Sequence, residues 1–509
     1  MKKITICIFI LSFLLYRPYQ LQDSGLKYGD DDDVYFSHAI AITQLEFPTT
    51  GKFPVGSGMM AAPFVFVFSM LDKINGVRVT DVHSDAAVKS WTQFGFVFSS
   101  MLYFWLSCYL LFKTLRLYFS ENHSLVAVIL MVLLQGVPLY VYRRPIFSHV
   151  YELFLQSLLV YFIVRYDRMN EEGHYLSVMF ICFIIGMVVV VRYNNAIIAL
   201  SWPIVIWGIR NNGIINKNRL KKVLYAYGIL FLPMLTLFII PEIYYSEWTR
   251  FNYFIKVSSI LLTNLQNLTL LFYFKRLLHV LIGIDWGLFF TAPFIILSLI
   301  SFCYFEAPFK RLLLIPSLAL FITFFMFVLS WRSQGAWYGY RYIIFSAIPI
   351  LTLPMANLIK HEHQRYGKKI YIPILFISLL PLFSMLCFEG NPDTLTLSGS
   401  DKNGNWIFWG NPTFQLEVWK TFLFNVKGFI IAVFKGGPLY IIYLLAVFLK
   451  KTQLLPPIVL EKYPRFELMV LFKSLIIYLL PFAFYSIYMY FNKWNLGTLL
   501  GRTNRTRSK

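Results

Sequence analysis

Residues 28–64 read YGDDDDVYFSHAIAITQLEFPTTGKFPVGSGMMAAPF, and the interpretation of the whole chain starts from this stretch. It follows a short apolar segment, Ile4–Tyr16, and precedes the next long apolar run. The four acids Asp30–Asp33 therefore stand where the chain has just left a bilayer, and carboxylates there are costly unless they are solvated or used. Two interpretations stay open: a catalytic carboxylate held at the membrane surface, or a solvated acidic loop that caps the next helix at its positive end.

The composition of the chain determines its class. Of the 509 residues, 58% are hydrophobic, 19% are aromatic and only 14% are charged, and the mean hydropathy is +0.61. The apolar runs exceed the length of a buried helix in a soluble protein. The formal net charge of +21 lies mainly in short loops between these runs, which is the positive-inside pattern and also favours contact with anionic membrane lipids. The sequence therefore predicts an all-α polytopic membrane protein, and we expect no nucleic-acid partner.

The alternation of apolar runs with basic clusters predicts about 11–13 transmembrane helices in a single domain over residues 1–509. Lys2 and Lys3 place the N-terminus in the cytoplasm. We expect residues 17–90 to form a first extracytoplasmic loop that carries the acidic motif, with short amphipathic helices in such loops. Residues 242–285 and 389–427 form further loops on that side. The spans after the first loop include Leu125–Tyr140, Val150–Val164 and Phe466–Tyr490, and the orientation of the C-terminal tail stays open.

The predicted outer face keeps positive charge that the positive-inside rule would rather exclude. The side chains concerned are Arg143, Arg144, Arg192, Lys256, Lys275, Arg276, Arg332 and Arg341. Each alone is more often a headgroup contact than a ligand. Several of them at the mouths of different spans, opposite an acidic loop, indicate phosphate binding, because arginine presents a planar fork of donors. A carboxylate that takes a proton from a hydroxyl, with cations that neutralise a leaving phosphate, would suit a transfer reaction at the membrane surface.

Five pieces of the sequence, in this order, resemble the GT-C glycosyltransferases, the multispan enzymes that use a polyprenyl- or dolichyl-phosphate sugar. The first piece is the acidic loop, with residues 29–35 and the turn FPVGSGM and residues APF that follow it. The other pieces are RPIFSH at Arg144–His149, VRYNN at Val191–Asn195, GLFFTAP at Gly287–Pro293 and WYGYR at Trp337–Arg341. All five fall on the predicted outer face. The acidic motif of the family is usually shorter than four aspartates, and the chain after Arg341 carries none of these pieces.

The resemblance implies an inverting transfer with a carboxylate base. One of Asp30, Asp31, Asp32 and Asp33 would take the proton of the acceptor hydroxyl, whose oxygen then attacks the anomeric carbon of the lipid-phosphate sugar. We favour Asp31 or Asp32, because a helical start would place either of them near the ring of Tyr35. If the acid run is only a solvated cap, Glu46 and Glu389 are the next candidates for the base.

The resemblance also implies the contacts with the substrates. The donor phosphate would be held by Arg192 and Arg341, with Arg143 or Arg144. The sugar side would meet Tyr35, His149, Trp337, Tyr338 and Tyr340. For His149 the alternative is a hydrogen-bonded histidine at a helix start. For the aromatic residues it is the belt of Trp and Tyr that membrane proteins keep at the interface.

We expect no cofactor and assign no metal site. Adjacent carboxylates are able to bind Mg²⁺ or Mn²⁺, so a divalent metal remains the alternative. The ligand spacing of a calcium loop is absent from the sequence. Arginine alone is moreover able to neutralise a lipid-phosphate leaving group.

The predicted function is a glycosyltransferase, more narrowly a hexosyltransferase, at the outer face of the bacterial inner membrane. It would move a sugar such as glucose from undecaprenyl phosphate, or another polyprenyl phosphate, to a hydroxyl of a glycan acceptor. That acceptor would be a lipid-linked glycan, the O-antigen of lipopolysaccharide or another component of the cell envelope. Two other functions stay open: a polymerase of lipid-linked glycans, and a flippase or transporter.

Overall fold

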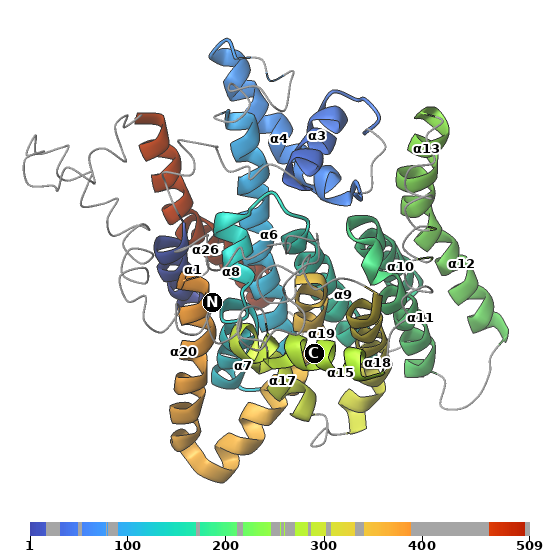
Figure 1. Cartoon of the computed structure of the whole chain (residues 1–509), viewed down its shortest axis with the longest axis vertical. Helices are drawn as coiled ribbons and strands as arrows, with labels where there is room; N and C mark the ends of the chain where they lie inside the picture. Colours follow the sequence, from blue (N-terminus) through green and yellow to red (C-terminus); the bar gives the residue numbers. More distant parts are fainter. Residues whose placement is uncertain are drawn as a thin grey trace, which may run out of the picture.

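The computed structural model describes residues 1–16, 31–48, 53–77, 79, 90–168, 174–210, 217–245, 255, 259, 270–282, 287–301, 307–330, 341–387 and 468–503. Every regular element within these ranges is a helix (Figure 1). Some of the predicted positions lie outside the described residues, namely Asp30, Lys256, Arg332, Trp337, Tyr338, Tyr340 and residues 389–427.

Four helical runs in the described part of the chain are long and apolar enough to cross a membrane. They are α4 (Gly56–Ile74), α6 (Trp91–Arg116), Ile343–Leu382, which belongs to α19 (Arg341–Tyr366) and α20 (Tyr371–Cys387), and Phe472–Asn492 within α26 (Leu468–Thr503). Four shorter apolar helices accompany them: Leu176–Val191, Tyr193–Ile206, Leu224–Leu237 and Leu312–Met326. The all-α, multi-pass membrane architecture predicted from composition is confirmed. The count of 11–13 spans stays a prediction, because residues 388–467 lie outside the described part.

The segment predicted as a span at Leu125–Tyr140 is helical and apolar, but a bend that the sequence analysis did not predict breaks it. α7 (Glu121–Val128) continues through a π-helical turn and then bends by 57° into α8 (Val137–Arg143). Gly136 marks the bend with a φ of 80°, a left-handed conformation that glycine adopts without the steric cost of a side chain. The bend directs the RPIFSH segment after α8 into the interior, where all of its side chains are buried.

Two glycines of α4 bring the acidic helix α3 (Asp31–Thr43) close to the end of α10 (His174–Val191). A Cβ atom on Gly58 would lie 2.6 Å from the Cβ of His38 in α3, and a Cβ on Gly56 would lie 2.7 Å from the backbone nitrogen of Val191. Neither separation is compatible with a side chain, so both positions require glycine for close packing. The GSG turn of the sequence thus places Asp31 in the same region as the residue after Val191.

The remaining walls of this region come from α9 (His149–Arg168) and α19. α9 packs against α6, α10 and α19, and α19 lies beside it in the lower half of Figure 1, while α3 and α4 lie in the upper part. The starts of α3, α9 and α19 and the end of α10 therefore meet in one place. Helix ends present unpaired backbone groups and steep local fields, which makes this meeting point a natural position for charged side chains.

Candidate active site

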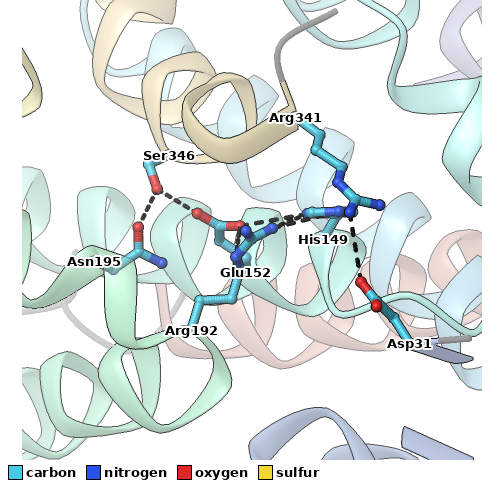
Figure 2. A network of polar contacts seen from close by, with 7 residues as sticks. All are labelled: Asp31, His149, Glu152, Arg192, Asn195, Arg341 and Ser346. Carbon is cyan, nitrogen blue, oxygen red and sulfur yellow. Dashed lines mark hydrogen bonds and ion pairs between the residues drawn. The ribbon is translucent and has the colours of Figure 1, made fainter. Parts of the chain in front are cut away.

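A line of polar contacts crosses the place where these helix ends meet (Figure 2). Arg192, directly after α10, and Arg341, the first residue of α19, are its two cations. Figure 2 shows His149 between them, with an acid on the far side of each arginine. The acids are Glu152 for Arg192 and Asp31 for Arg341.

The Arg192 guanidinium is held from the protein interior. Its Nε lies 3.4 Å from Oε2 of Glu152, a carboxylate whose side chain is 0% exposed. Its Nη1 also contacts the imidazole Nδ1 of His149. A buried carboxylate is very costly alone, so the pair neutralises both groups and fixes the orientation of Arg192.

Two further side chains hold Glu152 in turn. The Ser346 hydroxyl donates to Oε1 of Glu152 at 2.5 Å, and it also lies 2.6 Å from Oδ1 of Asn195. One hydroxyl has only one hydrogen to give. If the Asn195 amide is turned over, its Nδ2 donates to Ser346 and Ser346 donates to Glu152, so the hydroxyl no longer faces two acceptors with one hydrogen. The contacts then run continuously from the 3₁₀ turn Tyr193–Asn195 through α19 to α9.

The Arg341 guanidinium faces the acidic helix instead. Its Nη2 lies 3.4 Å from Oδ2 of Asp31, with side-chain exposures of 7% and 17%. The guanidinium also stacks on Phe147, 5.2 Å from the ring centroid, and the Arg144 guanidinium lies 5.7 Å from the same ring. Phe147 therefore brings a third cation into the region through cation–π contacts.

His149 is enclosed by aromatic rings. Its imidazole stacks on Phe147 at 5.8 Å and on Phe345 at 4.8 Å, both with an interplanar angle of 18°, and Tyr140 meets it edge-on. Since a guanidinium carries only donors, the nitrogen that contacts Arg192 must be the unprotonated one. His149 is thus a neutral acceptor that orients Arg192, which favours the hydrogen-bonded histidine that the sequence left as an alternative.

Tyr35 lies beside the same cluster, one turn after Asp31 in α3. Burial, reinforced by the Asp31 carboxylate, raises the pKa of Tyr35 to about 12, although Arg192, a hydrogen bond with the Ser148 side chain, and Arg341 oppose the shift. The phenol therefore stays protonated at neutral pH and remains a hydrogen-bond donor. Its ring packs on Phe53 from the turn before α4, with centroids 5.7 Å apart.

The remaining predicted residues are placed as follows. Asp32 is buried at 2% exposure, whereas Asp31 and Asp33 are partly exposed. Arg143 is fully buried, and its Nε donates to the carbonyl oxygen of Leu15 at 3.1 Å, which caps the C-terminal end of α1 (Lys2–Leu15). This contact gives Arg143 a role in helix packing, apart from the line of contacts in Figure 2.

Sequence reasoning missed Glu152, Asn195 and Ser346 as members of the site. Glu152 had a usable signal, because an acid inside a predicted span is expensive and marks a functional position. Asn195 lay within the quoted VRYNN piece but received no role. Ser346 offers no signal in sequence, because a lone serine in an apolar helix is common. Among the described residues no group of three or more His, Cys, Asp or Glu side chains is arranged to hold a metal ion.

Comparisons with known proteins give structural neighbours only. No family model matches the sequence, and a search of curated proteins finds no match. The chain is similar to ArnT from Cupriavidus metallidurans bound to undecaprenyl phosphate, with a TM-score of 0.46, 12% identity, and 85% of this chain and 76% of that chain covered.

It is also similar to the oligosaccharyltransferase AglB from Archaeoglobus fulgidus in complex with an inhibitory peptide and a dolichol-phosphate. For this structure the TM-score is 0.41 and the identity 13%, with 82% of this chain and 63% of that chain covered. The similarity lies in the arrangement of helices, and the sequences differ at most positions.

Proposed function

We propose that this chain is a membrane glycosyltransferase that moves a sugar from a polyprenyl-phosphate donor to a hydroxyl of a glycan acceptor. The observation that carries the proposal is the convergence of Arg192 and Arg341, from distant parts of the chain, on one buried place beside Asp31. Two oriented guanidinium groups supply a site for phosphate, and an adjacent carboxylate supplies a proton acceptor.

The charges of the cluster fit an anionic donor. The formal charges of Asp31 and Glu152 cancel those of Arg192 and Arg341, and Arg144 beside Phe147 adds one positive charge. A sugar-phosphate-lipid diester brings one negative charge to this place. When the bond to the sugar breaks, the phosphate becomes a monoester that carries further negative charge near neutral pH. Preformed cations bind the leaving phosphate more strongly than the donor, and this difference lowers the barrier.

Asp31 is the acid that the geometry favours as the base. It is partly exposed at the start of α3 and touches the same arginine that would bind the phosphate, whereas Asp32 is buried. In the reaction, Asp31 accepts the proton of the acceptor hydroxyl and the oxygen forms a bond to the anomeric carbon. The bond from that carbon to the phosphate breaks on the opposite face, and the phosphate leaves with the electron pair. The configuration of the sugar therefore inverts.

The finer identity of the substrates is proposed from the sequence. The donor lipid is undecaprenyl phosphate, the sugar is a hexose such as glucose, and the acceptor is O-antigen or another glycan at the outer face of the bacterial inner membrane. Tyr35 is the proposed sugar contact, whereas His149 serves to orient Arg192. The protonated phenol of Tyr35 is suited to donate a hydrogen bond to a sugar oxygen.

The test is a transfer assay with the purified full chain in lipid discs. It uses synthetic polyprenyl-phosphate hexoses and measures the release of polyprenyl phosphate. In parallel, the mass of the surface glycan is compared between a host strain with the gene and one without it. We expect release of the lipid phosphate and a gain of one hexose per glycan unit. An unchanged glycan together with no release from any donor would overturn the proposal.

A further inference from the structure

The ion pair between Asp31 and Arg341 joins the proposed base to the proposed phosphate ligand. Oδ2 of Asp31 and Nη2 of Arg341 are 3.4 Å apart, and the pair bridges the first residues of α3 and α19. A carboxylate oxygen that faces a guanidinium is a weaker proton acceptor than one that does not, because the cation stabilises its charged form. The contact seen here therefore disfavours the role that the proposed reaction requires of Asp31.

Arg341 stands where a second anion is able to replace Asp31. The residue begins α19, a helix of 26 residues, so the positive end of the helix dipole adds to the guanidinium charge. A phosphate at this place would meet both, as anions at helix starts commonly do. Asp31, in contrast, lies in the first turn of α3, where its own helix start stabilises a carboxylate without Arg341. Exchanging the partner of Arg341 is thus inexpensive for both residues.

The other ion pair of the cluster is not exchangeable in this way. Glu152 is 0% exposed and is held by Ser346, so its carboxylate is enclosed by the protein and fixed beside Arg192. Asp31 is the more exposed of the two acids, at 17%. An anion that enters the site therefore competes with Asp31 and leaves the pair of Arg192 and Glu152 intact.

We propose that the Asp31–Arg341 ion pair is a latch that the phosphate of the donor opens. The inference rests on the proposed function and adds an order to it. In the free protein the Asp31 carboxylate forms an ion pair with Arg341. The donor phosphate then binds Arg341 in place of Asp31, and Asp31 becomes free to accept the proton of the acceptor hydroxyl. Donor binding thereby activates the base, and the acceptor reacts only after the donor is in place.

Binding of a polyprenyl phosphate without sugar tests the latch separately from catalysis. If Asp31 competes with the phosphate for Arg341, Asp31→Asn removes the competitor and tightens binding by about fivefold. The matched control is Asp33→Asn, which removes one negative charge from the same helical turn and is expected to change the affinity less. Binding is measured by calorimetry on the full chain in lipid discs, with the uncharged polyprenol as a second ligand whose affinity does not change.

A double-mutant cycle assigns the effect to Arg341. In the Arg341→Ala background Asp31→Asn is expected to have no further effect on the affinity for the lipid phosphate. Equal tightening by Asp31→Asn and Asp33→Asn, or tightening that persists without Arg341, would show a general charge effect and overturn the latch. If the wild-type chain binds polyprenyl phosphate no better than polyprenol, the proposed function itself fails. A wild-type chain that binds, with an Asp31→Asn variant that binds no more tightly, overturns the latch alone.

Discussion

Arg192 and Arg341 are equally buried arginines, at 7% and 6% exposure, yet their surroundings differ. Arg192 is neutralised from the interior by Glu152, which Ser346 and α19 hold in place. Arg341 is neutralised by Asp31, a partly exposed residue on a separate helix. The comparison shows one guanidinium that is oriented from the interior, while the other has the more exposed partner, which the proposed latch exchanges for the donor phosphate.

The largest effect is expected for Asp31, the acid whose ion pair with Arg341 is proposed to exchange. Asp31→Asn keeps the size of the side chain but removes the proton acceptor, so transfer should fall by about two to four powers of ten. Binding of the donor should not be lost, and the latch requires it to tighten by about fivefold. Asparagine variants at Asp32 and Asp33, assayed with the same polyprenyl-phosphate sugar, serve as controls and should lose much less. A sharp loss at Asp32 with a mild effect at Asp31 would move the base to the buried acid and contradict the comparison.

Four of the predicted residues take part in the polar contacts of Figure 2, and the reason lies in the local sequence. Asp31, His149, Arg192 and Arg341 each belong to a short contiguous piece that joins a charged or aromatic residue to a helix end. Such pieces can be recognised in the sequence because the functional side chain and the signal for the end of a helix lie within a few residues of each other. Their roles in catalysis remain predictions.

The contacts that join one helix to another could not be predicted from the sequence in the same way. The pairing of Glu152 with Ser346 joins α9 to α19, and the contact of Arg143 with the Leu15 carbonyl joins α8 to α1. Both are tertiary contacts between residues far apart in the chain, and no local pattern encodes them. The bend at Gly136 was missed for a related reason, because apolar composition continues through it and only the glycine and Pro138 mark the break.

The second prediction compares the arginines directly. Removal of one stabilising donor typically costs about two to three powers of ten in rate, so Arg192→Ala and Arg341→Ala should both lose most transfer. Lysine should restore only part of it, because the planar fork is lost. The arginines should differ in stability: Arg192→Ala leaves the buried Glu152 unpaired, whereas Arg341→Ala leaves Asp31 partly solvated. Wild-type rates in both alanine variants would show that these side chains are not phosphate ligands.

The third prediction concerns Glu152, the buried acid that pairs with Arg192. Glu152→Gln keeps an acceptor for Ser346 but leaves Arg192 as an uncompensated buried charge, which should lower the free energy of unfolding by about 3–5 kcal/mol. Thermal unfolding in detergent measures the loss, with Asp33→Asn as the control, a partly exposed acid that is expected to lose about 1 kcal/mol or less. Adding Arg192→Met to Glu152→Gln should restore stability but not transfer. A Glu152→Gln protein as stable as the wild type would mean that the Arg192–Glu152 pair does not fix the arginine.

The smallest expected effect belongs to Ser346, which acts on Arg192 indirectly, through Glu152 and Asn195. Ser346→Ala removes the hydroxyl that donates to Oε1 of Glu152, a loss of about 1 kcal/mol for a typical hydrogen bond. Ser157→Ala is the matched control, because that buried hydroxyl lies in α9 and donates only to the Leu153 carbonyl oxygen among its described contacts. Both variants should lose similar stability, but only Ser346→Ala should lower the transfer rate, by less than about tenfold. Since Ser346 touches no substrate in the proposed site, a reduced rate with unchanged donor affinity would reveal misorientation of Arg192. Equal rates in the two variants would show that Ser346 contributes to packing only. The orientation of Arg192 would then depend on Glu152 and His149 without Ser346.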